Sequence, residues 1–327
     1  MAPHGGDRRD RRAAVRRGLQ TGGKEPETRV NPQEAASVAG WSSVAWLARR
    51  TPERAGRAVF GQLADQVWRR RGNGVPQLER NLARVLAAEP TSSAVRRVSR
   101  AAMASYARYW WEALRLPSWD RAEILARATV AGWGRVTEAV RDRGAVVALP
   151  HMGNWDLAGA WAAANGVPVT AVAERLKPEA VFQKFVAYRE QVGIEVVPLG
   201  DPDVVATLVQ RASDHRLVTL LTDRGFGASG VDVEFFGEPA RMPVGAATVA
   251  LRAGVPLFPV TLWYDDLARV QVHEPVEVPA AGDERAQVAE MTAAVGRVFE
   301  QAVRKHPADW HMLQRIWTAD RFARAGA

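Results

Sequence analysis

One histidine in this sequence stands at a spacing that suits general-base chemistry. His151 is followed five residues later by Asp156, and no other histidine has an aspartate at that distance. An imidazole can take the proton of an attacking hydroxyl, and a carboxylate on its far ring nitrogen fixes the tautomer. The chain has no G-x-S-x-G nucleophile elbow, so a substrate hydroxyl would attack without a covalent acyl-enzyme. We predict His151 as the catalytic base and Asp156 as its partner.

The elements around this pair decide whether the two side chains can meet. Residues 144–149 form a short apolar, β-branched run of the kind found in buried strands. In an open α/β sheet, ligands bind beyond the carboxyl ends of the strands, and His151 lies just past such an end. Within one continuous helix a spacing of five would separate the side chains. His151 must therefore precede the helix at 156–165, with Gly153 permitting the turn.

Downstream of this motif the sequence alternates between strand and helix patterns. The other strand candidates are residues 167–172, 195–199, 217–221, 231–236, 257–262 and 270–273. The other helix candidates are residues 178–192, 202–213, 244–253 and 285–305. Such alternation predicts an α/β fold with a central, mostly parallel β-sheet flanked by helices. Gly237, Pro239 and Pro243 are expected to shape a turn.

The first third of the chain has a different texture. Four helical patterns, at residues 35–48, 53–71, 77–86 and 94–114, predict an N-terminal helical subregion. It should pack on the α/β body, so we expect residues 31–327 to form a single domain. Residues 1–30 are rich in Arg, Gly and Asp and poor in large apolar residues, which predicts a disordered basic tail.

Composition narrows the choice of partner. The net charge of +8 and the complete lack of cysteine favour an anionic partner and exclude disulfides, a thiol nucleophile and zinc–thiolate sites. Nucleic acid, anionic lipid and a phosphate-bearing co-substrate all fit the charge. His306 and His311 flank Trp310 without a metal-ligand spacing, so no metal is predicted.

A basic amphipathic segment points towards a membrane surface. The helix expected at 53–71 places Val59, Leu63 and Val67 on one side and arginines on the other, which is typical of interfacial helices. The alternative is an ordinary surface helix packed on the core. No stretch is long enough to span a bilayer, and no apolar h-region follows the N-terminal arginines, so we expect a cytoplasmic protein.

Several ordered motifs together resemble a known family. They are HMGNWD (151–156), AERLKPE (173–179), YRE (188–190), DRG (223–225), VEFFGEPARMPVG (233–245), VPLFPV (255–260) and HPADWHMLQRIW (306–317). The sequence is similar to the lysophospholipid acyltransferase superfamily, and within it to the bacterial lipid A biosynthesis acyltransferase branch. The residues of these motifs most resemble those of actinobacterial phosphatidylinositol mannoside acyltransferases.

The resemblance implies a function as well as a fold. It implies an acyltransferase that uses acyl-CoA as co-substrate, with no permanently bound cofactor. The acceptor would be a mannose hydroxyl of a phosphatidylinositol mannoside, an anionic glycolipid. Such an enzyme would work as a peripheral protein on the inner, cytoplasmic face of the cell membrane. His151 and Asp156 carry over as the base and its partner.

The resemblance also implies a set of substrate-binding residues. These are Glu174, Arg175, Arg189, Asp223, Arg224, Glu238 and Arg241. By position, Glu174 and Arg189 would line the active groove, and Glu238 and Arg241 would belong to an acceptor and phosphate motif. Asp223 is a departure, because the mannoside enzymes carry Glu there while the lipid A branch carries Asp. It bears on which acceptor is used.

Elementary chemistry is compatible with these assignments. Arg175, Arg224 and Arg241 offer forked donors that suit phosphates of CoA or of an inositol lipid. Glu174 and Asp223 could accept hydrogen bonds from sugar hydroxyls or hold those arginines. The competing interpretation for each residue is an ion pair that braces a loop.

Other functions remain open on the residues alone. The same mechanism could serve another glycolipid or a lysophospholipid, and with water as acceptor it would give a thioester or lipid hydrolase. A non-catalytic lipid-binding protein would not need His151. A nucleic-acid-binding module would explain the charge but not a His/Asp pair at a strand end, and we expect no nucleic-acid partner.

Overall fold

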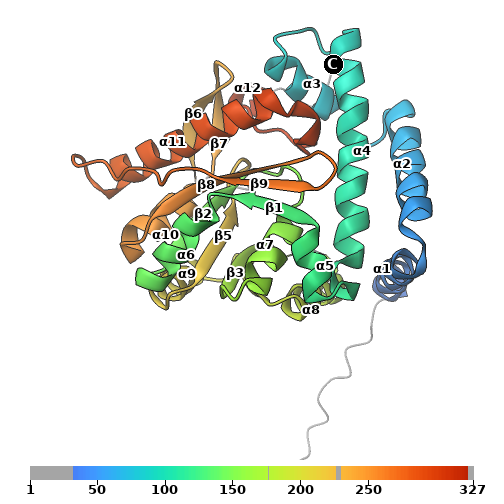
Figure 1. Cartoon of the computed structure of the whole chain (residues 1–327). Coiled ribbons are helices and arrows are strands. Elements are labelled where there is room, and N and C mark those ends of the chain that lie inside the picture. The colour runs from blue at the N-terminus through green and yellow to red at the C-terminus, as the bar shows by residue number, and fades with distance from the viewer. Residues whose placement is uncertain (1–31, 176, 226–229, 323–327) are drawn as a thin grey trace, which may run out of the picture.

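A seven-stranded sheet forms the centre of the structure (Figure 1). This computed structural model describes residues 32–175, 177–225 and 230–322. The strands of the sheet are β1 (Ala128–Ala131), β2 (Ala145–Leu149), β3 (Val169–Glu174), β4 (Ile194–Leu199), β5 (Leu217–Leu221), β8 (Leu257–Tyr264) and β9 (Ala268–Val272). Their order is β1-β9-β8-β2-β5-β3-β4. All neighbouring pairs are parallel except β8 and β9, which confirms the predicted α/β class.

Strand β2 lies in the middle of this sheet and shows why the sheet is buried on both faces. All five of its residues are buried, and side chains alternate between the faces with a period of two. Val146 and Ala148 join a core cluster that includes residues of three helices, α9, α10 and α11. Val147 and Leu149 face the opposite cluster, with residues of α6 and α7.

The helices that cover these two faces come from the α/β part of the chain. They are α6 (Trp133–Asp142), α7 (Trp155–Ala164), α8 (Glu179–Gln191), α9 (Val204–Ser213), α10 (Gly245–Ala253) and α11 (Glu284–Lys305). Two short helices, α5 (Arg121–Ala126) and α12 (Thr318–Phe322), belong to the same part of the chain. Within the described ranges, no helix is long and apolar enough to cross a membrane.

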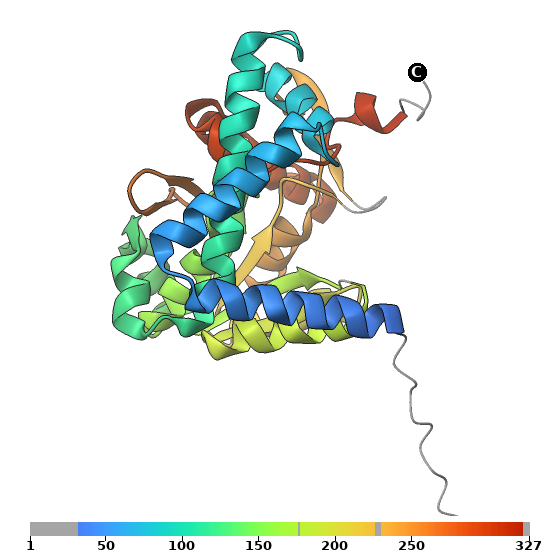
Figure 2. The ribbon, with the colours of Figure 1, turned by 90° about the vertical axis from the view of Figure 1, so that its right-hand side faces the viewer.

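The predicted N-terminal helical subregion is present and surrounds one long helix. Its members are α1 (Pro32–Arg50), α2 (Glu53–Arg69), α3 (Val75–Val85) and α4 (Ser93–Arg115). Helix α4 lies beside the sheet, and α1, α2 and α3 pack against it (Figure 1). In Figure 2 the blue α1 lies along the yellow-green α8, and the two helices are in contact.

The sequence-based prediction needs correction in several places. Strand β1 and helices α5, α6 and α12 were not expected. Residues 231–236 do not join the central sheet: β6 (Val231–Phe235) pairs with β7 (Glu238–Met242) in a separate antiparallel hairpin. The expected turn is confirmed at Gly237, which has φ of 76°, but Pro239 lies inside β7. The predicted basic tail, residues 1–30, lies outside the described residues.

Candidate active site

His151 and Asp223 meet where two neighbouring strands end. Strands β2 and β5 are parallel, with Leu149 opposite Leu221, and both loops that follow reach the same edge of the sheet. His151 Nδ1 lies 2.5 Å from Asp223 Oδ1. The backbone N–H of His151 donates to Asp223 Oδ2 at 2.9 Å. The acidic partner of His151 is therefore Asp223, and the predicted pairing with Asp156 is wrong.

Asp156 makes different contacts because of where its helix begins. Asn154 caps α7, its Oδ1 accepting the N–H of Leu157, so Asp156 lies in the first turn of the helix. There its buried carboxylate accepts hydrogen bonds from Tyr109 Oη and Arg189 Nε, both at 2.8 Å. Asp156 thus joins α7 to α4 and α8 and does not touch His151.

The electrostatics of Asp223 suit a group that supports a base. Its side chain is fully buried, and Oδ2 accepts a second hydrogen bond from Trp310 Nε1 at 2.9 Å. Burial alone would raise the pKa of Asp223, but the charge and hydrogen bonds of His151, together with the indole of Trp310, hold it below its ordinary value. An ionised carboxylate keeps the proton of His151 on Nδ1. The lone pair of His151 Nε2 is then available to a substrate.

His151 lies in the wall of a cavity of about 570 Å³. The wall is mainly apolar, and it draws on β3, α8, α9, β5 and α10. The apolar lining residues include Val172, Phe182, Phe185, Val186, Leu199, Val204, Val205, Leu220 and Leu221. A cavity with apolar walls and few polar groups is suited to a small apolar ligand or an acyl chain. His151 therefore lies beside a space of that kind.

Polar groups at the cavity come from three of the residues expected there. Glu174, at the end of β3, lines the cavity together with Arg224, and the two side chains are 3.4 Å apart. Arg189 also lines it and is buried in an ion pair with Asp156. Burial would lower the pKa of Arg189, but the carboxylate of Asp156 raises it above its ordinary value. Arg189 is therefore a fixed cation in the wall.

The other expected binding residues lie elsewhere. Arg175 is half-exposed, 3.8 Å from Asp201 and 3.9 Å from Glu179, and does not line the cavity. In the β6–β7 hairpin, Glu238 pairs with Arg84 of α3 at 2.9 Å. Arg241 lies 3.3 Å from Asp232 across the same hairpin. These contacts fit the competing interpretation of ion pairs that brace the fold.

The structure also changes the interpretation of Asp223. A fully buried carboxylate that is occupied by His151 and Trp310 has no surface for an acceptor sugar. Its position beside His151 therefore gives no support to the expectation that Asp223 binds the acceptor. It gives no information on which acceptor is used.

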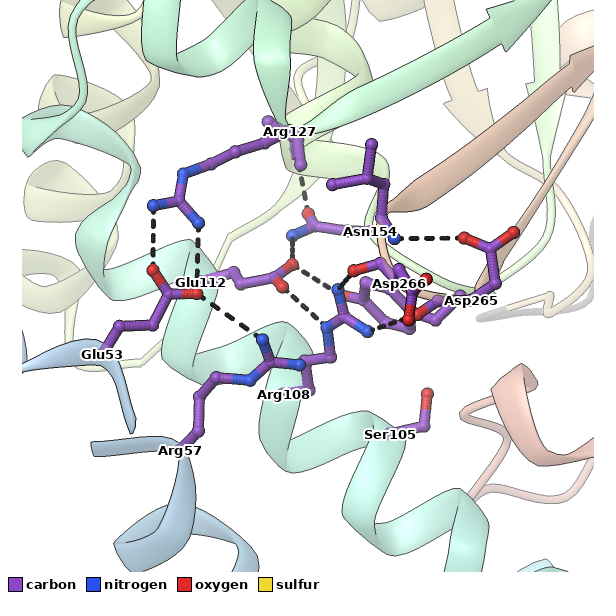
Figure 3. A network of polar contacts seen from close by, with 12 residues as sticks. Glu53, Arg57, Ser105, Arg108, Glu112, Arg127, Asn154, Asp265 and Asp266 are labelled. Atoms are coloured by element: carbon purple, nitrogen blue, oxygen red, sulfur yellow. Dashed lines mark hydrogen bonds and ion pairs between the residues drawn. The ribbon is translucent and has the colours of Figure 1, made fainter. Parts of the chain in front are cut away.

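The buried carboxylate of Glu112 holds Asn154 (Figure 3), which lies three residues after His151. Glu112 of α4 accepts hydrogen bonds from Asn154 Nδ2 and Tyr264 Oη, both at 2.8 Å, and from Arg108 Nε at 2.8 Å. Asn154 uses its other side-chain atom to cap α7. The start of α7 is thereby tied to the long helix α4, which keeps the loop after β2 in place.

Several residues of the site were not singled out from the sequence. Tyr109 and Trp110 line the cavity, and Trp310 holds Asp223. Asp223 was expected only as a substrate-binding residue. A signal for its place beside His151 existed, because it follows the strand run 217–221 as directly as His151 follows 144–149. Among the residues that the structure describes, no three His, Cys, Asp or Glu side chains gather as metal ligands would.

Comparison with known proteins gives the family of the chain. The model of the bacterial lipid A biosynthesis acyltransferase family matches residues 28–319. The chain belongs to this family. It is therefore an O-acyltransferase on the α/β fold described above.

Two similar relatives share most of their length with the chain. A protein of Mycolicibacterium smegmatis (strain ATCC 700084 / mc(2)155), named phosphatidylinositol mannoside acyltransferase, is 42% identical over 287 residues, covering 86% of this chain and 90% of the relative. A protein of the same name from Mycobacterium tuberculosis (strain CDC 1551 / Oshkosh) is 39% identical over 305 residues, covering 91% and 93%.

Proposed function

We propose that the chain transfers an acyl group from acyl-CoA to a mannose hydroxyl of a phosphatidylinositol mannoside, with His151 as general base and Asp223 as its partner. The observation that carries the proposal is the His151–Asp223 pair in the wall of a mainly apolar cavity. The names of the two relatives support the acceptor, and the apolar lining of the cavity and the family resemblance support the acyl donor.

The chemistry needs only one proton to move. His151 Nε2 removes the proton of the mannose hydroxyl as its oxygen attacks the thioester carbonyl. The C–O bond forms, the C–S bond breaks, and the CoA thiolate leaves with the proton from the imidazolium. Asp223 stabilises the imidazolium in between, as the acid of a hydrolase triad does. No serine is needed, since the substrate supplies the hydroxyl.

The cavity can hold the acyl part of the donor. Its apolar wall, formed from β3, α8, α9 and β5, removes a hydrocarbon chain from water, which is worth about 0.8 kcal/mol for each buried methylene. Arg224 and Arg252 also lie in the lining, where each is paired with a carboxylate, Glu174 and Glu284 respectively, and can exchange that partner for a phosphate of CoA or of the acceptor. Trp110, in the same lining, offers an aromatic face to a sugar ring.

The surface of α1 and α2 supports a peripheral position at a membrane. Of the nine exposed large apolar residues in the described chain, six belong to these two helices. They are Val44, Trp46, Leu47, Val59, Leu63 and Val67. Arginines at the helix ends, including Arg50 and Arg69, add the charge that attracts anionic lipid. Helix α1 packs on α8, which lines the cavity, so this surface is near the site.

The decisive experiment is acyl transfer by the wild type and by His151→Gln. With labelled palmitoyl-CoA, a phosphatidylinositol mannoside and a lysophospholipid, mass spectrometry should find acylated mannoside only with the wild type. Loss of the base should lower turnover by about 10²–10⁴-fold. His215→Gln, an exposed histidine that follows α9, is the control and should retain activity. Wild-type turnover in His151→Gln would refute the mechanism.

Hydrolysis is the second candidate for the same geometry. A base beside an apolar cavity could equally direct water to a thioester. The two functions differ in their dependence on acceptor: a transferase releases CoA in proportion to added mannoside, while a hydrolase releases it at the same rate without one. Free fatty acid as the main product would favour hydrolysis.

A further inference from the structure

A short segment after α11 crosses behind His151 and Asp223 and contacts both. Residues 309–311 form this segment, which we call the C-terminal strap. Its central residue, Trp310, is fully buried and forms an antiparallel bridge with Met152, the residue after His151. None of the proposed chemical steps uses the strap directly, yet its backbone and one indole N–H contact the catalytic pair.

The indole of Trp310 fixes the orientation of the Asp223 carboxylate. Oδ2 of Asp223 accepts two hydrogen bonds at 2.9 Å, one from Trp310 Nε1 and one from the backbone N–H of His151. The χ2 torsion of an aspartate is only weakly restricted by itself, so hydrogen bonds decide the plane of its carboxylate. With two donors on Oδ2, the other oxygen, Oδ1, points at His151 Nδ1.

The strap backbone holds the loop that bears the base. The N–H of His311 donates to the carbonyl of His151 at 2.8 Å, and the N–H of Gly153 donates to the carbonyl of Asp309 at 2.9 Å. These bonds hold the backbone that directly follows the His151 side chain, on either side of Met152. They restrict the imidazole to the position in which it meets Asp223.

The strap is itself anchored to two distant elements. Asp309 Oδ1 accepts a hydrogen bond from Ser105 of α4 at 2.6 Å, and Oδ2 accepts the N–H of Tyr264, at the end of β8, at 3.1 Å. Ser105 also lies 3.0 Å from His311 Nε2. The strap therefore cannot shift without breaking contacts to the long helix and to the central sheet.

We infer that Trp310 is a positioning residue of the acyl transfer, which it serves by locking Asp223 in the plane that orients His151. The inference rests on the proposed function, since it assigns Trp310 a part in the same reaction. A second buried tryptophan provides a matched comparison. Trp317 is also fully buried, with its ring centroid 6.1 Å from that of Trp310, but its indole N–H donates to the backbone carbonyl of Phe235 at 2.9 Å.

The test compares Trp310→Phe with Trp317→Phe. Both variants lose one indole hydrogen bond and similar volume, so both should lower thermal stability to a similar degree. Only Trp310→Phe should lower kcat, by about 10–100-fold, with KM changed less than threefold. This range is taken by analogy from metal sites, where the lost hydrogen bond is one to a metal-binding side chain. The acidic limb of the pH–rate profile of Trp310→Phe should also move to higher pH. Without the indole hydrogen bond, the negative charge of Asp223 is stabilised by His151 alone and favours the protonated imidazole more strongly.

Two further measurements keep the test decisive. If Trp310→Phe does not fold, replacing Trp310 by 3-benzothienylalanine retains the bicyclic shape and removes only the N–H. Proton NMR of the His151 Nδ1–H resonance reports the Asp223 contact without any turnover, and this resonance should shift in the Trp310 variants and not in Trp317→Phe.

The outcomes separate the inference from the function. Wild-type kcat, pH profile and Nδ1–H resonance in the Trp310 variants would overturn the inference. Equal losses of kcat in Trp310→Phe and Trp317→Phe with no shift of the acidic limb would also overturn it. If the wild type transfers no acyl group while the resonance still shifts in Trp310→Phe, the proposed function fails and the structural contact stands.

Discussion

At the scale of single residues, two buried aspartates near His151 carry different tasks. Asp223 contacts the imidazole, while Asp156 contacts Tyr109 and Arg189. Both carboxylates are nearly inaccessible to water, so each is retained only because its partners offset the cost of desolvation. The partners of each carboxylate decide whether it orients His151 or joins one helix to its neighbours.

This difference predicts opposite phenotypes for two similar substitutions. Asp223→Asn should lower kcat by about 10³–10⁴-fold, because the amide no longer stabilises the imidazolium and can favour the wrong tautomer. Asp156→Asn should instead lower the free energy of unfolding, by about 3 kcal/mol, since the buried guanidinium of Arg189 loses its counter-ion. Urea unfolding and turnover should be measured on both variants. A greater loss of kcat in folded Asp156→Asn than in Asp223→Asn would contradict the assignment.

A second residue-scale prediction concerns acid stability. Burial, helped by the charge of His151, lowers the pKa of His311 to about 3 from 6.5. Between about pH 6.5 and about pH 3, the imidazole of His311 is therefore protonated in the unfolded chain and neutral in the folded chain. Stability should fall as the pH drops through this window, by up to about 1.4 kcal/mol for each pH unit from this one group.

His311→Gln removes that proton and still places a polar group near Ser105. Urea midpoints at pH 7, 6 and 5 should fall less steeply for this variant than for the wild type. His215→Gln, which changes an exposed histidine, should follow the wild-type slope. Parallel curves for wild type and His311→Gln would show that His311 does not dominate this pH dependence. Asp223, whose pKa is lowered, adds its own loss of stability only below about pH 4.

At the scale of elements, the strands that carry the site were predictable from local patterns, and their order in the sheet was not. Local patterns located β2 and β5, and so the loops of His151 and Asp223. The order of strands depends on contacts between distant segments: His151 and Asp223 are 72 positions apart in the sequence. The nearest acidic residue downstream, Asp156, was therefore an attractive partner and the wrong one.

The two missed strands, β1 and β7, share a physical reason. Strand β1 has only four residues, and β7 contains Glu238, Pro239 and Arg241, which are poor strand formers. Strand β7 forms because Ala240 and Met242 alternate into the core and because its partner β6 is one tight turn away. Tertiary burial decided both strands, and local propensity gave no sign of it.

Packing between α2 and α4 gives a prediction at this scale. Gly56 faces the ring of Trp111, and an added Cβ would lie 2.0 Å from it, whereas Gly61 on the same helix has nothing within 4 Å. Gly56→Ala should therefore lower the melting temperature by pushing the two helices apart. Gly61→Ala should raise stability by up to about 1 kcal/mol through helix propensity. Calorimetry on both would check this, and a neutral Gly56→Ala would mean that α2 docks loosely.

At the scale of the whole molecule, exposed apolar side chains and arginines occur together on α1 and α2. The net charge is +8, and the exposed apolar residues of the described chain gather on α1 and α2. Arg50 lies over the ring of Trp46, with the guanidinium carbon 4.3 Å from the ring centroid. Such a surface can insert its apolar side chains between lipids while its arginines face the anionic head groups.

The last prediction follows from this combination. Leu47→Ser with Leu63→Ser should weaken binding to vesicles of mixed neutral and anionic phospholipid by about tenfold or more, because two exposed leucines lose their burial in the interface. Wild-type binding should weaken further at high salt and on purely neutral vesicles, since the arginines act through screened charge. A control pair, Leu267→Ser with Val278→Ser, removes exposed apolar side chains from other parts of the surface and should bind like the wild type. Turnover of detergent-solubilised substrate should be the same in all three proteins, because neither pair lines the cavity. Equal vesicle binding by both double variants would show that α1 and α2 do not form the membrane surface.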